Sequence, residues 1–324
     1  MAAWTAQSTR LKFGVGDYVL MSVRFKALVF SGHFAELCGL QQPMPPPVPL
    51  PPGIDSVVIR SHPVADALPR ISRSGEFLRY VPMTYKRYYT DLQSGTFQDY
   101  LKRHSSKSRA TLVRKVKRFA DASGGVIDYR EYRLASEMAT FYRLAWAVSR
   151  RSYQESLLAS GLPSHEDFVG ELKALAEQDL VRGYILSFEQ RPIAYILCPA
   201  LGDVLLYQYV GYDPAFARLS PGSVLQYCAL ETLFQQRRFR LFDFTEGEGQ
   251  HKEFFASHAT QCADIYYFKR SFQRSALVAL HAGVFRCSRL AGRALASFHL
   301  KATFKKWLRQ HGRHLAAHSE VGPA

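Results

Sequence analysis

The segment "GYDPAFARLSPGSVLQYCALETLFQQ", residues 211–236, decides the fold, because it joins a strand pattern to a helix pattern through a short turn. It follows "VLLYQYV" (204–210), an apolar and aromatic run that predicts a β-strand. Pro221 is a favoured residue in the first turn of a helix, and no carboxylate occupies that turn. The segment therefore predicts a strand that runs directly into a helix with an electropositive N-terminus.

The start of this predicted helix has the properties of an anion-binding site. The first N–H groups of a helix have no intrahelical partners, and the helix dipole favours negative charge there. Gly222 allows a ligand to approach the backbone closely, and Arg218 can donate charge-assisted hydrogen bonds to a phosphate. An ordinary strand–loop–helix connection explains the same residues, so the pattern alone leaves both interpretations open.

The surrounding residues predict an α/β domain with a mixed sheet flanked by helices. Helix patterns cover residues 99–120, 136–151, 164–178, 221–237 and 251–257, and strand patterns cover residues 126–132, 181–188, 192–201, 204–212, 240–244 and 263–270. The order over residues 126–270 is β-α-α-β-β-β-α-β-α-β. Because short turns join the three consecutive strands, we expect the middle of the sheet to be antiparallel.

Three segments follow from these patterns. Residues 1–98 are expected to form a β-rich N-terminal lobe, in which residues 41–53 hold seven of the sixteen prolines and form a spacer or an exposed loop. Residues 99–270 contain the α/β domain. Residues 271–324 are expected to form a basic amphipathic helical tail.

The net charge of +15 is concentrated in two segments. Residues 99–118 carry eight Lys or Arg and one Asp, and residues 271–324 carry nine Lys or Arg and one Glu. Such segments attract anionic partners such as phosphates, lipid headgroups or nucleic acid, although two solvated helix faces would look the same.

The N-terminus lacks the pattern of a signal peptide, and no window of 18 uncharged apolar residues is present. The five cysteines are odd in number and widely spaced, which indicates reduced thiols. We therefore expect a cytoplasmic protein, with peripheral contact at the inner membrane face through the tail. We expect no metal site, since the closest cluster, His251, His258 and Cys262, lacks zinc-like spacing.

The element order and the wording "GYDPAFARLSPG…LFDFTEGEGQHKEFF" resemble the CelD-like branch of the GNAT acyltransferases, which is related to the FemAB aminoacyltransferases. That branch shares a "G-Y-D…S-P-G…D-F…G…Y-K" series, and the resemblance covers roughly residues 99–270. Pro221 and Ser223 stand at the two small positions of the general GNAT turn, on either side of Gly222, and this Pro-Gly form resembles the CelD-like variant. The chain departs from the branch at His251, which stands where the branch has Tyr before Lys252.

The resemblance implies an N-acyltransferase that uses acetyl-CoA or another acyl-CoA and acylates an amine of a small molecule or sugar, in exopolysaccharide or cellulose production. The pyrophosphate would bind at the turn, and pantetheine would lie between the strands 204–212 and 240–244. We also expect a backbone N–H around Tyr209–Gly211, at the end of the strand 204–212, to polarise the thioester carbonyl. The residues implied in donor binding are Tyr209, Val210, Gly211, Arg218, Ser220, Pro221, Gly222 and Ser223.

Acyl transfer to an amine also needs a group that accepts the amine proton. The loop after "LFDF" gathers Asp243, Glu246 and Glu248 with His251 and Lys252, and clustered carboxylates raise one another's pKa. Glu246 is the first candidate for the base and Asp243 the second, while His251 has an ordinary pKa close to neutrality. Each of these residues also has a purely structural interpretation, as a cap, a turn residue or the start of a surface helix.

Two other functions stay open at this point. A FemAB-like transferase would take its donor from aminoacyl-tRNA, with the basic helix at 99–118 on the tRNA backbone; otherwise nucleic acid is not expected as a partner. A non-catalytic partner at a membrane surface would use the tail. The tail pairs Lys and Arg with the apolar residues Phe298, Leu300, Phe304, Trp307 and Leu308.

Overall fold

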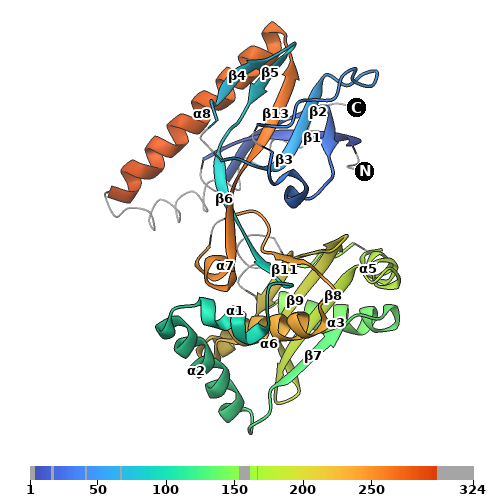
Figure 1. The fold of residues 1–324 in the computed structure, drawn as a ribbon, viewed down its shortest axis with the longest axis vertical. Helices are drawn as coiled ribbons and strands as arrows, with labels where there is room; N and C mark the ends of the chain where they lie inside the picture. Colours follow the sequence, from blue (N-terminus) through green and yellow to red (C-terminus); the bar gives the residue numbers. More distant parts are fainter. Residues whose placement is uncertain are drawn as a thin grey trace. The chain divides into compact units, whose positions relative to one another are not determined.

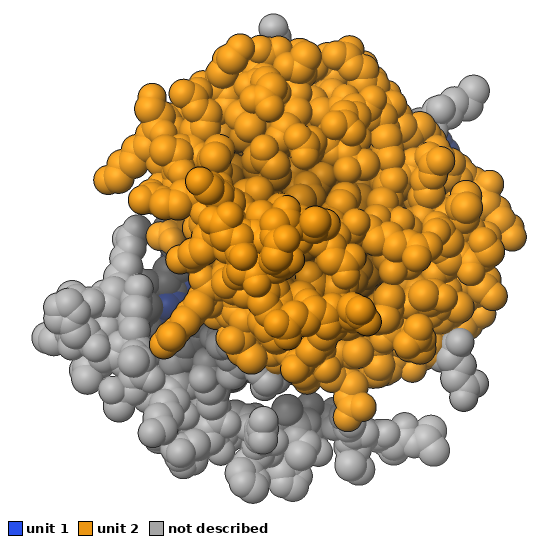
Figure 2. Space-filling view, turned by 90° about the horizontal axis from the view of Figure 1, so that it is seen from below, with its two compact units in different colours: residues 1–85, 261–324 blue, residues 86–260 orange. Residues whose placement is uncertain are grey.

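The computed structural model describes residues 4–15, 18–40, 42–65, 68–152, 161–165, 167–247 and 249–297. The chain divides into two compact units, one of residues 1–85 and 261–324 and one of residues 86–260 (Figure 1; orange in Figure 2). The boundaries of the expected segments 1–98, 99–270 and 271–324 differ from those of these two units, and the division into three segments stays a prediction.

The unit of residues 86–260 contains a mixed sheet, as the sequence predicts. Its strands lie in the order β7 (Asp128–Tyr132), β8 (Val181–Phe188), β9 (Arg191–Leu201), β10 (Val204–Leu206), β12 (Leu241–Asp243) and β6 (Thr84–Asp91). β10 and β12 pair in parallel, and the other neighbours pair antiparallel. A further strand, β11 (Tyr209–Tyr212), pairs with β9 outside this order.

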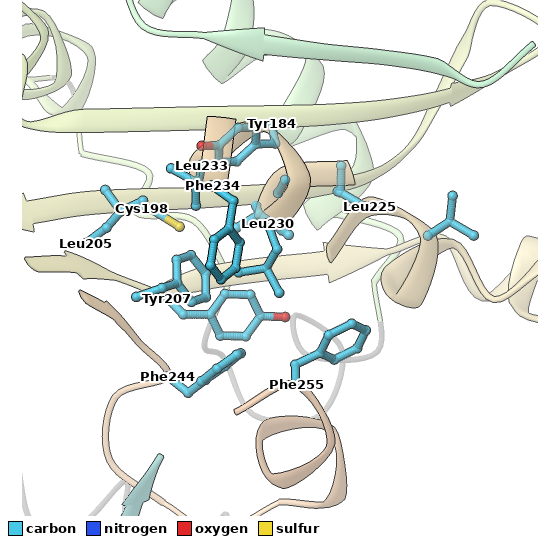
Figure 3. Close-up of a cluster of buried hydrophobic side chains, with 14 of the residues drawn as sticks. Tyr184, Cys198, Leu205, Tyr207, Leu225, Leu230, Leu233, Phe234, Phe244 and Phe255 are labelled. Carbon is cyan, nitrogen blue, oxygen red and sulfur yellow. The ribbon is translucent and has the colours of Figure 1, made fainter. Parts of the chain in front are cut away.

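Helices cover both faces of this sheet. Since successive side chains of a strand point to opposite faces, neighbouring residues of one strand belong to two different cores. Tyr184 and Ile196 belong to the core under α1 (Phe97–Arg103), α2 (Ser106–Ala122) and α6 (Pro221–Gln236). Their neighbours Ile185 and Tyr195 belong to the core under α3 (Met138–Ser149) and α5 (Phe168–Glu177). Figure 3 shows the first of these cores, in which the aromatic rings of Tyr207, Phe234, Phe244 and Phe255 pack with aliphatic side chains.

Two predicted elements are divided in the structure. The helix expected over 99–120 is two helices, because Ser105 caps α2 by accepting a hydrogen bond from the backbone N–H of Ser108. The strand expected over 204–212 is interrupted between β10 and β11. The pairing with β9 shifts by one residue between Leu205 opposite Ala200 and Tyr209 opposite Leu197, which is a bulge.

The other unit is β-rich, as expected. It contains β1 (Trp4–Val15), β2 (Tyr18–Phe30), β3 (Ser56–Pro63), β4 (Ile71–Ser74), β5 (Phe77–Tyr80), most of β13 (His258–Lys269) and the helix α8 (Phe272–Ser297). The described part of the Pro-rich segment is a loop tied to this unit, since Met44 bonds His62 through its N–H and Tyr267 through its carbonyl.

The first half of the predicted tail packs on this β-rich unit. Val278 and Ala282 of α8 lie in a core with Leu11 and Phe13, and His281 contacts the hydroxyl of Tyr80. The apolar residues of the tail beyond Ser297, named above, lie outside the described residues. None of the described helices combines the length and apolar character that crossing a bilayer requires.

Candidate functional site

A pocket of about 550 Å³ lies where two parallel strands separate. The pairing of β10 with β12 ends at Leu206 and Asp243; β11 then follows β9, while the chain after β12 turns into a loop and α7 (Gln250–Phe255). The pocket is lined by Ser152, Tyr195, Ile196, Tyr207, Val210, Gly211, Tyr212, Ala217, Ser220, Pro221, Gly222, Ser223, Leu225, Gly249, His251 and Lys252. All of these residues belong to the unit of residues 86–260.

One edge of the pocket is the edge of β11 that faces away from β9, which no other described strand pairs with; we call it the free edge of β11. The N–H of Asp213 donates to the carbonyl of Ile193 (2.8 Å), which sets the alternation of hydrogen-bonded pairs along β9 and β11. By that alternation the N–H groups of Val210 and Tyr212 point away from β9. Gly211 lies so close to β9 that an added Cβ would stand 2.7 Å from Cε1 of Tyr195. A larger residue at this position would therefore displace the pocket wall.

A second edge is the N-terminus of α6. Ser220 precedes the helix in the left-handed conformation (φ 55°), and Pro221 contributes no N–H. The N–H groups of Ser223 and Val224 both donate to the carbonyl of Ser220, at 3.0 and 3.1 Å. In the first turn of α6, the N–H of Gly222 therefore has no acceptor within the helix and can donate a hydrogen bond to a ligand.

Two cations from α2 flank this helix start. Nζ of Lys115 lies 3.3 Å from Oγ of Ser223, and Nη2 of Arg118 lies 3.4 Å from Oγ of Ser220. Arg118 also donates to the carbonyl of Arg218. The side chain of Arg218, the cation that the sequence pattern singles out, is exposed, and Arg218 is not among the pocket-lining residues. Together with the dipole of α6, Lys115 and Arg118 make this end of the pocket electropositive.

Asp243 is fully buried and held by Arg87 of β6. Nη2 and Nε of Arg87 lie 2.5 and 3.0 Å from Oδ2 of Asp243, and the N–H of Thr245 donates to Oδ1 (2.9 Å). The carboxylate therefore fixes the start of the loop between β12 and α7. Arg87 is 156 residues away in the chain, so no spacing in the sequence connects it with Asp243.

Glu246 and Lys252 are joined through the backbone. The side chain of Glu246 is half exposed, with Oε1 3.9 Å from Nη1 of Arg87, and Glu246 does not line the pocket. Its carbonyl accepts a hydrogen bond from Nζ of Lys252 (2.6 Å), which does line the pocket. Burial lowers the pKa of Lys252. Glu248 lies outside the described residues.

His251 and Tyr207 form a pair, and both residues line the pocket. Nε2 of His251 lies 3.1 Å from the hydroxyl of Tyr207, and the two rings are stacked. Burial, with the charges of Lys115 and Lys252, lowers the pKa of His251 to about 4. Burial raises the pKa of Tyr207, whose ring packs against Phe244 in the core (Figure 3). At neutral pH the pair is therefore an uncharged imidazole beside a protonated phenol.

The pocket brings together most of the site residues that the sequence suggests. Of these, Val210, Gly211, Ser220, Pro221, Gly222, Ser223, His251 and Lys252 line it, whereas Tyr209, Arg218, Asp243 and Glu246 do not. Nothing in the sequence distinguishes Tyr207 from Tyr209 and Tyr212 on the same predicted strand. Within the described residues, no group of three or more His, Cys, Asp or Glu is arranged to hold a metal ion.

One family model matches part of the chain. Residues 106–253 match the family model described as an acetyltransferase (GNAT) domain. No curated protein sequence matches the chain significantly.

Several solved structures are similar to the chain at low sequence identity. FemX is 9% identical, with a TM-score of 0.47 over 85% of this chain and 90% of FemX. L-PGS from Bacillus licheniformis is 12% identical, with a TM-score of 0.41 over 71% of this chain and 72% of that one. An aminoglycoside acetyltransferase from an uncultured soil metagenomic sample, in complex with sisomicin, is 12% identical, with a TM-score of 0.29 over 40% and 80%. These likenesses are too distant to transfer a substrate.

Proposed function

Because residues 106–253 match the model of an acetyltransferase (GNAT) domain, we propose that the protein is an acyltransferase. It moves an acyl group, acetyl in the simplest case, from acyl-CoA to an amine of a small molecule or sugar. The observation that carries the proposal is the lining of one pocket. The electropositive N-terminus of α6 and the uncharged His251–Tyr207 pair both line it. The phosphates of an acyl-CoA need an electropositive surface, and its reacting thioester needs groups that accept and donate protons.

The donor end suits a pyrophosphate. The N–H of Gly222, the hydroxyls of Ser220 and Ser223, and the cations Lys115 and Arg118 all lie at the start of α6. Anions bind at such helix starts because N–H groups and the dipole act together. The free edge of β11 then offers backbone hydrogen bonds to the amides of pantetheine, and the N–H of Val210 is suited to polarise the thioester carbonyl.

The His251–Tyr207 pair is suited to move the amine proton to the leaving thiolate. In the tautomer with the proton on Nε2, Nδ1 of His251 accepts a proton from the attacking amine. Nε2–H then donates to the oxygen of Tyr207, 3.1 Å away, while the phenol gives its own proton to the thiolate. The C–S bond breaks, the C–N bond forms and one proton passes from nitrogen to sulfur, so the reaction balances.

The carboxylates have other contacts. Both oxygens of Asp243 already accept hydrogen bonds, and the side chain of Glu246 points toward Arg87 and solvent. The geometry therefore favours His251 as the proton acceptor, and base roles for Glu246 and Asp243 stay predictions. A role in exopolysaccharide or cellulose production, a tRNA-borne donor and membrane contact through the tail also stay predictions.

Thermal unfolding with acetyl-CoA tests the donor site. A ligand at about 100 times its Kd stabilises a protein by roughly 2.7 kcal/mol, so we expect the melting temperature to rise by several degrees. The double variant Lys115→Gln with Arg118→Gln is expected to lose most of this rise, because it removes both cations at α6. The matched control is Lys173→Gln on α5, which is exposed and away from the pocket. A wild-type protein that acetyl-CoA does not stabilise would contradict the proposal, and so would a full rise in the double variant.

A further inference from the structure

The outer face of α2 carries a large unbalanced charge. The helix contains the six cations Lys107, Arg109, Arg114, Lys115, Lys117 and Arg118, with Asp121 as its one carboxylate. In the described part of the chain, no ion pair joins any of the six to a carboxylate. Like charges at these spacings destabilise a helix, so folding alone does not account for them.

Three of the cations of α2 form a row that leads to the donor site. Lys107, Arg114 and Arg118 are seven and four residues apart, so they form one stripe along the helix. The stripe is about 16 Å long, from the rise of roughly 1.5 Å per residue. It ends at Arg118, beside Ser220 at the start of α6. An anionic partner along this stripe therefore reaches the phosphate end of the pocket.

The same face includes exposed apolar surface. Val113 is 48% exposed and Ala110 is exposed, and both lie next to Arg114 and Lys117 on the helix. A face that mixes cations with small apolar side chains is complementary to a helix with acidic and apolar residues.

A single-stranded nucleic acid fits this face less well. Proteins that bind single strands stack bases on exposed aromatic rings. The aromatic residues of α1 and α2, which are Phe97, Tyr100 and Phe119, are all buried. The surface therefore lacks stacking platforms and offers aliphatic contacts that a phosphate backbone does not use.

We propose that the outer face of α2 docks an acidic, helical carrier protein, which delivers the acyl group as a thioester on its phosphopantetheine arm. This inference rests on the proposed function and adds the carrier's arm to acyl-CoA as a source of the thioester. The arm carries a phosphate and pantetheine as CoA does, and so suits the same pocket. The reaction balances as before: the C–S bond of the arm breaks, the amide C–N bond forms, and the amine proton leaves with the arm's thiol.

Fluorescence anisotropy with a labelled carrier tests the docking without knowledge of the acceptor amine. The probe is an acyl carrier protein of fatty-acid synthesis with its phosphopantetheine arm attached. We expect Arg114→Glu with Lys117→Glu to weaken binding at least about tenfold at low salt, because both changes place like charges against an acidic partner. Neither residue belongs to the donor site, so the acetyl-CoA melting shift is expected to stay unchanged. Lys173→Glu is the matched control and is expected to bind the carrier normally.

The outcomes separate this inference from the proposed function. Free CoA should also displace the arm-bearing carrier, since the two share the α6 site. A wild-type protein that acetyl-CoA stabilises but that does not bind the carrier would overturn the docking inference alone. Equal carrier binding by the double variant and by wild type would overturn it too, as would a loss of tRNA binding in that variant with carrier binding intact. A protein that binds neither acetyl-CoA nor the carrier would overturn the proposed function as well.

Discussion

Replacing Arg87 by Ala is expected to lower the free energy of unfolding by roughly 3–5 kcal/mol, because it leaves a buried carboxylate without its partner. Asp243 is fully buried, and Arg87 is 9% exposed. Water therefore cannot replace the guanidinium unless the structure opens locally. Urea unfolding followed by both circular dichroism and tryptophan fluorescence measures this loss.

Two controls define what this result means. Arg87→Met with Asp243→Leu removes both charges and is expected to recover much of the stability, since the cost comes from one unpaired charge. Arg130→Ala breaks the exposed pair with Glu137 and is expected to cost less than about 1 kcal/mol. A loss of under about 1 kcal/mol in Arg87→Ala would show that the buried pair does not hold the loop after β12.

Replacing His251 by Ala is expected to lower kcat by about 10²–10⁴-fold, the usual contribution of a positioned proton acceptor. The acetyl-CoA melting shift should persist, because the α6 site is unchanged. The pKa of His251 is lowered to about 4, so the imidazole stays neutral throughout the range above about pH 5. We therefore expect kcat/KM of the wild type to rise with pH as the acceptor amine loses its proton, with no inflection near the ordinary histidine pKa of about 6.5.

The phenol provides the companion test for this pair. Tyr207→Phe keeps the ring that packs against Phe244 and removes only the hydroxyl that contacts His251. A reduced kcat with unchanged stability would support the proton relay. His258→Ala, at an exposed position, is the control. Wild-type kcat in His251→Ala would rule out the role we assign to this residue.

The sequence predicts the fold of residues 86–260 well, because its apolar periods are strong and its turns are short. Pro221 after an aromatic strand places the start of α6 correctly, and the "GD" turn gives the hairpin of β9 and β10. The bulge between β10 and β11 could not be predicted from the sequence, since "VLLYQYVGY" is an uninterrupted strand pattern. The interruption between β10 and β11 depends on which strands pair with β10, and a local sequence pattern does not contain that pairing.

The sequence predicts only part of the site, because some of its residues meet through contacts between elements that are distant in the chain. Residues within one turn, such as Ser220–Ser223, lie together in any fold that forms the turn. Lys115 and Arg118 reach that turn only because α2 packs against α6, and Arg87 reaches Asp243 only because β6 pairs with β12. Arg218 is close to the turn in the sequence, but its side chain is exposed and does not line the pocket, so its role in phosphate binding stays a prediction.

A crystal structure of the protein with CoA tests the central claim most directly, because it does not depend on the acceptor. The account predicts pyrophosphate density at the N–H of Gly222, within reach of Lys115 and Arg118. It also predicts pantetheine along the free edge of β11, with the sulfur near Tyr207 and His251. CoA bound at another surface, with the pocket between β11 and α6 left empty at saturating concentration, would contradict the account.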